Sequence, residues 1–275
     1  MMISIIGLGL IGASFANAIK TKTDHTVTGF DINIDVLNSA IDDRTIDFIG
    51  NDELLSQSDM VIVSLYPSAT IDFVKQNADK FKSGAIVIDT CGIKSEICKE
   101  LTAVSTQNGF IFIGAHPMAG KETSGYSSSC SDLFDNAYMI LTPLSASEET
   151  VNLLKDFSAK LGFKGVTIST PLEHDKIIAY TSQLPHVLAC AYISDPDAVR
   201  HDGFSAGSYK DVSRVATINA TMWTELFIEN KDCLTSHIDT LIENLQKLKT
   251  YIEKEDGESL SKMLDDGDKI KKRIG

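Results

Sequence analysis

The stretch Met2-Ile3-Ser4-Ile5-Ile6-Gly7-Leu8-Gly9-Leu10-Ile11-Gly12 joins a short apolar run directly to three glycines. The apolar run predicts a buried strand, and residues 10–20 after it predict a helix. The pattern Gly-x-Gly-x-x-Gly at such a junction is typical of a dinucleotide-binding turn. In such a turn Gly7 makes the bend, Gly9 lets the backbone approach a pyrophosphate, and Gly12 lets the helix pack closely on the strand.

The same turn predicts which cofactor binds. Leu8, Leu10 and Ile11 complete the predicted cofactor loop, and the helix that begins there offers free N–H groups and the positive end of its dipole to phosphates. About 20 residues further on, the motif expects an acid at the end of the second strand, and Asp31 stands there. A carboxylate at this place accepts hydrogen bonds from ribose hydroxyls and repels a 2′-phosphate, which favours NAD over NADP. The alternative is a glycine turn beside a surface aspartate.

Strand and helix patterns alternate from residue 2 to about residue 171. Seven apolar runs rich in Val and Ile predict strands at Ile3–Ile6, Thr26–Phe30, Met60–Leu65, Ala85–Ile88, Phe110–Ile113, Tyr138–Leu141 and Val166–Ile168. Amphipathic stretches between them predict helices at Leu10–Lys20, Val36–Ile41, Ala69–Lys80, Ser95–Thr106 and Glu149–Leu161. The alternation predicts a parallel sheet covered on both faces, an α/β Rossmann-type dinucleotide-binding domain over residues 1–170.

The remainder, residues 171–275, predicts an all-α domain. Helical periodicity covers residues 172–193, 215–228 and one long stretch from Leu234 to about Leu264. That stretch carries an apolar stripe at Leu234, Ile238, Leu241, Leu245, Leu248 and Ile252. Such a stripe needs a partner surface, which either other helices of the same chain or a second subunit can provide.

Composition excludes several classes of protein. Twenty-five Lys and Arg against thirty-eight Asp and Glu give the 275 residues a net charge of −13, which argues against a nucleic acid partner. No apolar run approaches the roughly 20 residues that span a bilayer, and the first residues lack the features of a signal peptide, so a cytoplasmic protein without a membrane partner is expected. Five scattered cysteines with no Cys-x-x-Cys pair predict neither a disulfide framework nor a metal site.

A histidine stands in a conspicuous loop after the strand Phe110–Ile113. The loop reads Gly114-Ala115-His116-Pro117-Met118-Ala119-Gly120-Lys121-Glu122-Thr123-Ser124-Gly125, so small residues around His116 leave room for a ligand. Chemistry in this fold sits on loops at the carboxyl ends of the strands. With an ordinary pKa near 6.5, an imidazole there can take the proton of a substrate hydroxyl while hydride leaves for the nicotinamide. The alternative is a histidine that only ends the strand.

Three motifs together carry a resemblance. They are the loop 114–125, then Glu173-His174-Asp175 leading to Leu184-Pro185-His186, then Asp211-x-Ser213-Arg214-Val215-Ala216 followed by Trp223. In their order and spacing the chain resembles the prephenate dehydrogenase family of tyrosine biosynthesis over essentially its whole length. The resemblance implies a Rossmann domain followed by a helical domain that dimerises. It also implies oxidative decarboxylation, with NAD or NADP, of prephenate to 4-hydroxyphenylpyruvate or, in some members, of arogenate to tyrosine.

The resemblance also implies roles for individual residues. His116 matches the catalytic histidine of the family, which removes the proton of the ring hydroxyl. Arg214 matches the arginine that binds a substrate carboxylate, for which its planar fork is suited. Lys94 stands where the family has a lysine near cofactor and substrate, with a solvated lysine at a helix start as the alternative. His186 lies close to the substrate in the family. His174 is a candidate for a residue that contacts a substrate-binding side chain without touching the substrate itself.

Two positions depart from the family pattern. Many members have serine at the position of Gly92, where a hydroxyl helps to hold the ring hydroxyl of the substrate. Here Ser95, Ser124 or a water substitutes for that donor, or His116 acts alone. Many members have a second histidine where this chain has Gln183, which forms hydrogen bonds but cannot titrate. These departures leave the reaction class unchanged and leave the choice between prephenate and arogenate open.

Two rival functions share this architecture. One is another dehydrogenase of hydroxy or imino acids, but such enzymes usually place the base on the helical domain, whereas His116 lies in the nucleotide-binding half. The other is a non-catalytic NAD-binding protein, against which the presence of both His116 and Arg214 argues. Prephenate dehydrogenase with NAD, acting as a homodimer through its helical domain, is therefore the predicted function.

Overall fold

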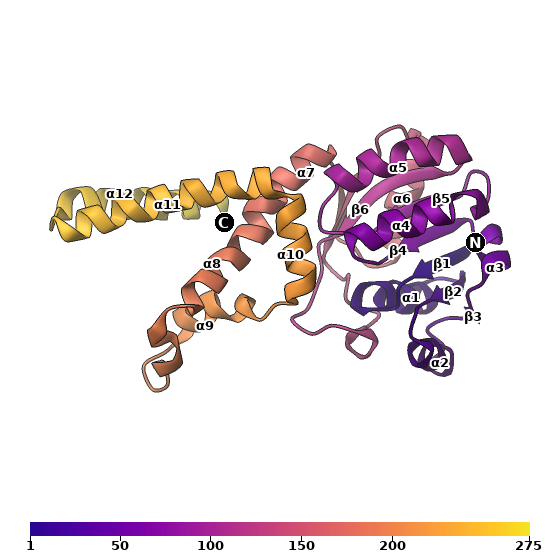
Figure 1. Cartoon of the computed structure of the whole chain (residues 1–275), viewed down its shortest axis with the longest axis horizontal. Helices are drawn as coiled ribbons and strands as arrows, with labels where there is room; N and C mark the ends of the chain where they lie inside the picture. The colour runs from indigo at the N-terminus through magenta and orange to yellow at the C-terminus, as the bar shows by residue number, and fades with distance from the viewer.

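One eight-stranded sheet runs through the first 168 residues of the computed structural model, which describes residues 1–275 (Figure 1). Its strands follow the order β3-β2-β1-β4-β5-β6-β7-β8. The bounds are β1 Met2–Ile6, β2 Thr26–Phe30, β3 Phe48–Ile49, β4 Met60–Val63, β5 Ile86–Asp89, β6 Ile111–Pro117, β7 Tyr138–Thr142 and β8 Gly165–Ile168. All seven predicted strands are confirmed, and the two-residue β3 is an addition.

The sheet is parallel except at one pairing, which corrects the prediction of a wholly parallel sheet. Strand β7 runs antiparallel to β6, with His116 paired to Ile140. The segment from β6 to β7 contains only the 3₁₀ turn Tyr126–Ser128, and no α-helix crosses back over the sheet to bring β7 in parallel. Helix α6 (Glu148–Lys160) does make such a crossover, and β8 is parallel to β7.

Both faces of the sheet are buried, as predicted. Along β4, Ile62 belongs to a core cluster of 25 residues on one face, whereas Val61 and Val63 belong to a cluster of 16 on the other. Successive side chains of a strand point to opposite faces, so an unbroken apolar run fits a strand covered on both sides. The covering helices besides α6 are α1 Leu10–Lys22, α2 Ile34–Asp42, α3 Asp52–Gln57, α4 Pro67–Gln76 and α5 Ser95–Asn108.

The second half of the chain is helical, as predicted. Its helices are α7 Pro171–Ile178, α8 Leu184–Ile193, α9 Gly207–Ser213, α10 Ala220–Glu229, α11 Lys231–Glu253 and α12 Gly257–Ile274. A π-helical turn at Ala179–Gln183 joins α7 to α8 just before Pro185, which has no N–H to continue the α-helical bonding. The predicted single stretch to Leu264 is wrong, because the chain breaks at residues 254–256, where Glu255 takes a positive φ of 54°.

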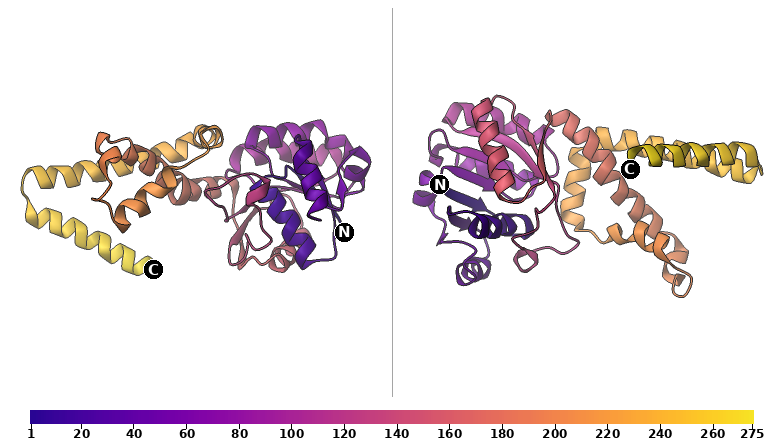
Figure 2. Two further views of the ribbon diagram at one scale, coloured as in Figure 1. Left: turned by 90° about the horizontal axis from the view of Figure 1, so that it is seen from below. Right: turned by 180° about the vertical axis from the view of Figure 1, so that it is seen from behind.

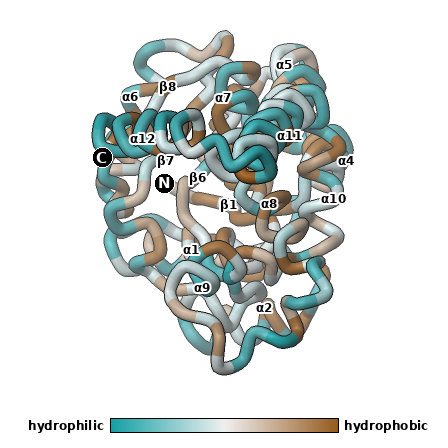
Figure 3. The backbone as a smooth tube through the Cα atoms, turned by 90° about the vertical axis from the view of Figure 1, so that its left-hand side faces the viewer, coloured by the Kyte–Doolittle hydropathy of each residue, from teal (hydrophilic) through white to brown (hydrophobic).

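Helices α11 and α12 form an arm that points away from the sheet (Figure 1), and Figure 2 shows α12 folding back from the far end of α11. Leu234 at the base of the stripe is buried, whereas Leu245 is 51% and Ile252 61% exposed. Helix α12 is mostly hydrophilic in Figure 3. Helices of the same chain therefore cover only the first part of the stripe. None of the helices combines the length and the apolar character needed to cross a bilayer.

Candidate active site

The glycine turn between β1 and α1 has the geometry of a phosphate-binding turn. Gly7 has a φ of +86°, a conformation that favours glycine, and a Cβ on Gly12 would lie 1.9 Å from the carbonyl oxygen of Gly7. A Cβ on Gly9 would meet nothing within 4 Å, so the backbone there is open to a ligand. The first N–H groups of α1, at Leu10 and Ile11, lie beyond Gly9 and have no partner within the helix.

Asp31 lies directly behind this turn. One oxygen of its carboxylate accepts a hydrogen bond from the N–H of Leu8 at 2.8 Å, and the other accepts one from Asn33 N–H at 2.9 Å. The side chain of Leu8 is buried, so Leu8 faces the turn with its backbone alone. The acid that was predicted from its spacing therefore lies against the glycine turn.

His116 lies on β6 at the start of a line of three side chains. Its Nδ1 lies 2.9 Å from Nε2 of His174, and Nδ1 of His174 lies 2.7 Å from a carboxylate oxygen of Asp175. His174 and Asp175 are buried on α7, in the helical half, whereas His116 is partly exposed. Burial, the neighbouring imidazole of His174 and the ammonium of Lys94 hold the pKa of His116 well below its ordinary value of 6.5. His116 is therefore neutral at pH 7 and able to accept a proton.

Lys94 is neither solvated nor in a position to contact a substrate, which corrects both predictions for it. Its side chain is 0% exposed and its ammonium forms an ion pair with Asp89, which is also 0% exposed. Asp89 accepts two further bonds, from the N–H of Ala115 at 3.1 Å and from that of Cys91 at 3.0 Å. The pair thereby fixes the backbone of β6 immediately before His116.

Gly92 lies beside the imidazole of His116. A Cβ on Gly92 would lie 4.0 Å from Cε1 of His116 and 3.6 Å from the side chain of Leu226. Leu226 lies on α10, which packs against the α/β half. Gly92 therefore lies between the base on one side and the helical half on the other.

His186 lies on α8 and packs against α10 about one turn before Leu226. Its ring packs against Trp223, with 3.9 Å between ring centroids, and its Nδ1–H donates to the carbonyl of Val215 at 2.7 Å. Burial and the charge of Arg214 lower the pKa of His186 despite that bond, so it is neutral at pH 7 with Nε2 as an acceptor. Trp223 stands three residues before Leu226, so the two side chains share one face of α10. His186, which packs on Trp223, therefore lies against the same face.

Gln183 does not face a ligand, which corrects the prediction that it binds substrate. It is 1% exposed and both ends of its amide are bonded within the protein. Its NH₂ donates to the carbonyl of Leu226 at 3.0 Å, and its oxygen accepts from Asn230 at 2.8 Å. Gln183 thus holds α10 against the start of α8.

Arg214 and Ser124 lie at the surface. The guanidinium of Arg214 is 3.0 Å from the carboxylate of Glu122, in the loop after His116, and both side chains are more than half exposed. Ser124 lies in the same exposed loop, where its carbonyl accepts a bond from the hydroxyl of Ser128. Arg214 therefore reaches from the helical half to the loop that follows the base.

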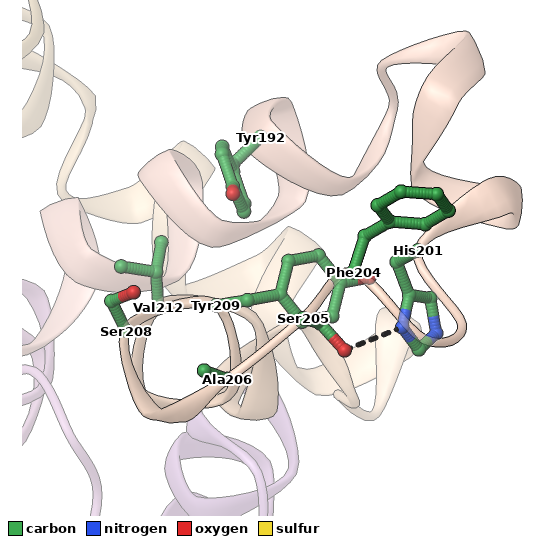
Figure 4. Close-up of a pocket in the computed structure, with 8 residues that line it drawn as sticks. All are labelled: Tyr192, His201, Phe204, Ser205, Ala206, Ser208, Tyr209 and Val212. Atoms are coloured by element: carbon green, nitrogen blue, oxygen red, sulfur yellow. Dashed lines mark hydrogen bonds between the residues drawn. The ribbon is translucent and has the colours of Figure 1, made fainter.

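A hollow lies apart from these residues. A cavity of about 460 Å³ at the end of α8 and the start of α9 is lined by aromatic side chains that include Tyr192, His201, Phe204 and Tyr209 (Figure 4). His201 stacks on Tyr209 with 4.6 Å between ring centroids and lies within a hydrogen bond of Ser205. No residue predicted for the active site lines it.

Comparison with known proteins agrees with this geometry. The family described as "Prephenate dehydrogenase, nucleotide-binding domain" matches residues 15–167, and "Prephenate dehydrogenase, dimerization domain" matches residues 170–266. The chain belongs to the prephenate dehydrogenase family. The prephenate dehydrogenase of Lactococcus lactis subsp. cremoris is 32% identical over 99% of this chain and 77% of its own length.

Two further relatives bear on the substrate and the cofactor. The cyclohexadienyl dehydrogenase of Zymomonas mobilis is 30% identical over 94% of this chain and 90% of its own length. The structure of prephenate dehydrogenase from A. aeolicus in complex with hydroxyphenyl propionate and NAD+ superimposes with a TM-score of 0.89 at 27% identity, covering 100% of this chain and 98% of that one.

Two acids of the site, Asp89 and Asp175, were not among the residues predicted from the sequence of this prephenate dehydrogenase family member. Asp89 ends the buried strand β5 and stands five residues before Lys94. Asp175 directly follows His174 in the stretch Glu173-His174-Asp175. An acid that ends an apolar strand shortly before a lysine, and a His-Asp pair at the start of a helix, are the signals that could have found them.

Replacing Lys94 tests its buried role. We expect Lys94→Met to lower the free energy of unfolding by about 3–5 kcal/mol, because it leaves the Asp89 carboxylate buried without its counter-ion. Urea unfolding followed by circular dichroism measures the loss. Lys262→Met, which removes an exposed ammonium paired with Asp266, is the control and is expected to stay near wild type. A Lys94→Met protein as stable as this control would contradict the role.

Proposed function

We propose that this protein is an NAD-dependent dehydrogenase that oxidises and decarboxylates prephenate to 4-hydroxyphenylpyruvate and carbon dioxide. One observation carries the proposal within the family. His116 is neutral at pH 7, its Nδ1 is bonded to His174, and it lies beside Gly92 at the same end of the sheet as the glycine turn. A base at that edge lies where this fold performs chemistry on a bound dinucleotide.

The residues of the glycine turn fit NAD. The open backbone at Gly9 and the free N–H groups of α1 suit a pyrophosphate, and the carboxylate of Asp31 suits ribose hydroxyls. No lysine or arginine directly follows Asp31, where Ile32 and Asn33 stand, so no cation is placed there to accommodate a 2′-phosphate. When bound, NAD accepts a hydride from the substrate.

His116 acts on the ring hydroxyl of the substrate. Because its Nδ1 is bonded to His174, its Nε2 is the nitrogen available to accept the hydroxyl proton. Removal of this proton lets the C–O bond become a carbonyl as the C–H bond on the same carbon breaks with loss of hydride. Loss of the ring carboxylate as carbon dioxide then leaves the electron pair of the broken C–C bond in the ring, which becomes aromatic and makes the overall step favourable. The resulting phenolate oxygen takes the proton back from His116.

The substrate is a dianion, and the protein has a net charge of −13, so binding requires a local cation. Arg214 supplies it beside the loop that follows His116. Its pair with Glu122 is exposed and therefore weak, so a substrate carboxylate competes effectively for the guanidinium. His186 supplies a neutral acceptor from the same half, and Ser124 a hydroxyl from the loop of Glu122.

The protein functions as a homodimer in this proposal. The outer part of the α11 stripe is uncovered, with Leu245 and Ile252 more than half exposed, and Leu264 and Ile270 of α12 are exposed as well. Exposed apolar residues in a row on a projecting arm are typical of a subunit interface. The description of the family domain over residues 170–266 supports the same conclusion.

Replacing the base tests the reaction. We expect His116→Asn to lower turnover of prephenate at least about 10²-fold while NAD binding persists, because the general base is lost but the glycine turn is intact. Absorbance of the reduced nicotinamide measures turnover, and parallel assays with arogenate show which substrate is preferred. His201→Asn, in the remote aromatic cavity, is the control. Turnover by His116→Asn close to that of His201→Asn would mean that another group takes the proton.

The pH profile tests the state of the base. The pKa of His116 is lowered, so the imidazole takes up a proton only well below pH 6.5. We therefore expect kcat/KM for prephenate to stay level as the pH falls from about 8 to about 6.5 and to decline only at lower pH, where protonated His116 can no longer accept the hydroxyl proton. A decline that begins near pH 7.5 would contradict this assignment.

Charged substitutions on the arm test the dimer. We expect the double variant Leu245→Asp with Ile252→Asp to sediment as a monomer, because two carboxylates would be buried in an apolar interface. Lys247→Asp, a substitution off the stripe of the same helix, is the matched control and is expected to stay dimeric. Sedimentation equilibrium measures both masses. A dimer that withstands the double substitution would place the interface elsewhere.

A further inference from the structure

The imidazole of His116 is the first of three groups joined in a line. Nδ1 of His116 lies 2.9 Å from Nε2 of His174, and Nδ1 of His174 lies 2.7 Å from Asp175. The two ring centroids are 5.1 Å apart with the rings edge to face, a geometry that aligns the two nitrogens. His174 is 2% and Asp175 4% exposed, so water does not compete for these bonds.

The protons along this line can be assigned from Asp175. Its carboxylate accepts bonds from the N–H groups of Lys94 and Ser95, each at 2.7 Å. These bonds and the one to His174 outweigh the effect of burial and lower the pKa of Asp175, so it is ionised at pH 7 and can only accept. His174 therefore carries its proton on Nδ1 and donates it to Asp175.

The assignment of His174 fixes that of His116. Burial lowers the pKa of His174, so it is neutral and its Nε2 is a bare acceptor. The short contact with His116 then requires His116 to donate from Nδ1. A neutral imidazole with its proton on Nδ1 has an unprotonated Nε2, which is the form that a general base needs.

We propose that His174 and Asp175 are positioning residues that hold His116 in the tautomer with its proton on Nδ1 and stabilise its protonated form during turnover. This inference rests on the proposed function, in which His116 is the base. Neither residue touches the substrate. Both act through the Nδ1 side of the ring, as the carboxylate of a serine protease does for its histidine.

The charges around the line favour the same outcome. Lys94 lowers the pKa of His116, but its ammonium is paired with Asp89. Asp175 is the anion at the far end of the line. Its bond and its charge raise the pKa of His174 against the effect of burial, so the line ends in a group that favours a positive charge on the imidazoles.

The carboxylate of Asp175 is itself held in place. It caps the first turn of α5 through the N–H groups of Lys94 and Ser95, and α5 has no capping side chain of its own. The backbone carbonyl of Asp175 accepts a bond from Asn230 at 2.9 Å. The line behind His116 is therefore anchored to α5 and to the residue that joins α10 to α11.

Asp175→Asn is the decisive variant. An amide at this place can donate to Nδ1 of His174, which moves the proton of His174 to Nε2. His174 then donates to Nδ1 of His116, so His116 carries its own proton on Nε2. We expect kcat to fall by about 10²–10⁴-fold, by analogy with the corresponding change in serine proteases, with KM and NAD affinity within about threefold of wild type. Glu173→Gln makes the same charge change two residues away on the exposed side of α7, and it is expected to keep wild-type kcat.

Replacing His174 separates orientation from simple structural support. Glutamine at 174 can accept from Nδ1 of His116 through its side-chain oxygen, whereas alanine cannot. We expect His174→Gln to exceed His174→Ala about tenfold in kcat at equal KM. Equal kcat in these two variants, or wild-type kcat in Asp175→Asn, would overturn the inference.

Histidine ¹⁵N NMR tests the tautomer without relying on a destabilising variant. We expect the wild-type spectrum at pH 7 to contain one imidazole, absent from His116→Asn, with a protonated Nδ1 and a bare Nε2. A proton on Nε2 of that imidazole would overturn the inference. If the wild-type enzyme turns over neither prephenate nor arogenate, the proposed function fails, and this spectrum still decides the tautomer.

Discussion

The hydrogen bonds between Asp175 and the first turn of α5 join the two halves of the chain at the place where the base is held. Asp175 belongs to α7. The N–H groups of Lys94 and Ser95, which donate to its carboxylate, belong to the α/β half. Because His174 is its neighbour on α7, the docking that satisfies this helix end also brings His174 against His116. Domain docking and the orientation of the base are thus one structural event, and a helical half displaced by a few ångströms would leave His116 without its partner.

The buried pair of Lys94 and Asp89 complements this contact from the other side. Burying two charges costs about as much as their attraction returns, so such a pair is a weak source of net stability. Its value here is positional, because Asp89 accepts from Ala115 N–H next to the base while the backbone of Lys94 donates to Asp175. Lys94 therefore contacts Asp89 through its ammonium and Asp175 through its N–H. These contacts fix the positions of β6, α5 and α7 relative to one another around His116.

The fold was predictable to the extent that its signals are local. The glycine stretch and the apolar runs define the strands, but a run such as Tyr138–Leu141 looks the same whether its strand is parallel or antiparallel. The break at Glu255 was missed although the turn dipeptide Asp256-Gly257 follows it. In the site, His116 and Asp31 were predictable from their places at strand ends. The burial of Lys94 and the bonds of Gln183 depend on partners such as Asp89 and Asn230, which only tertiary packing brings near.

The glycine at position 92 connects the departures from the family pattern to the line behind the base. The family resemblance implies a serine there in many members, whose hydroxyl helps to hold the substrate hydroxyl, whereas Gly92 places no side chain between Cε1 of His116 and Leu226. With that donor missing, nothing on the substrate side at residue 92 restrains the imidazole or selects its tautomer. The restraint then comes from the opposite side of the ring, through Nδ1 and His174. In the proposed reaction, a base oriented from behind keeps the Nε2 side of its ring for the substrate, whose ring hydroxyl meets no side chain at residue 92.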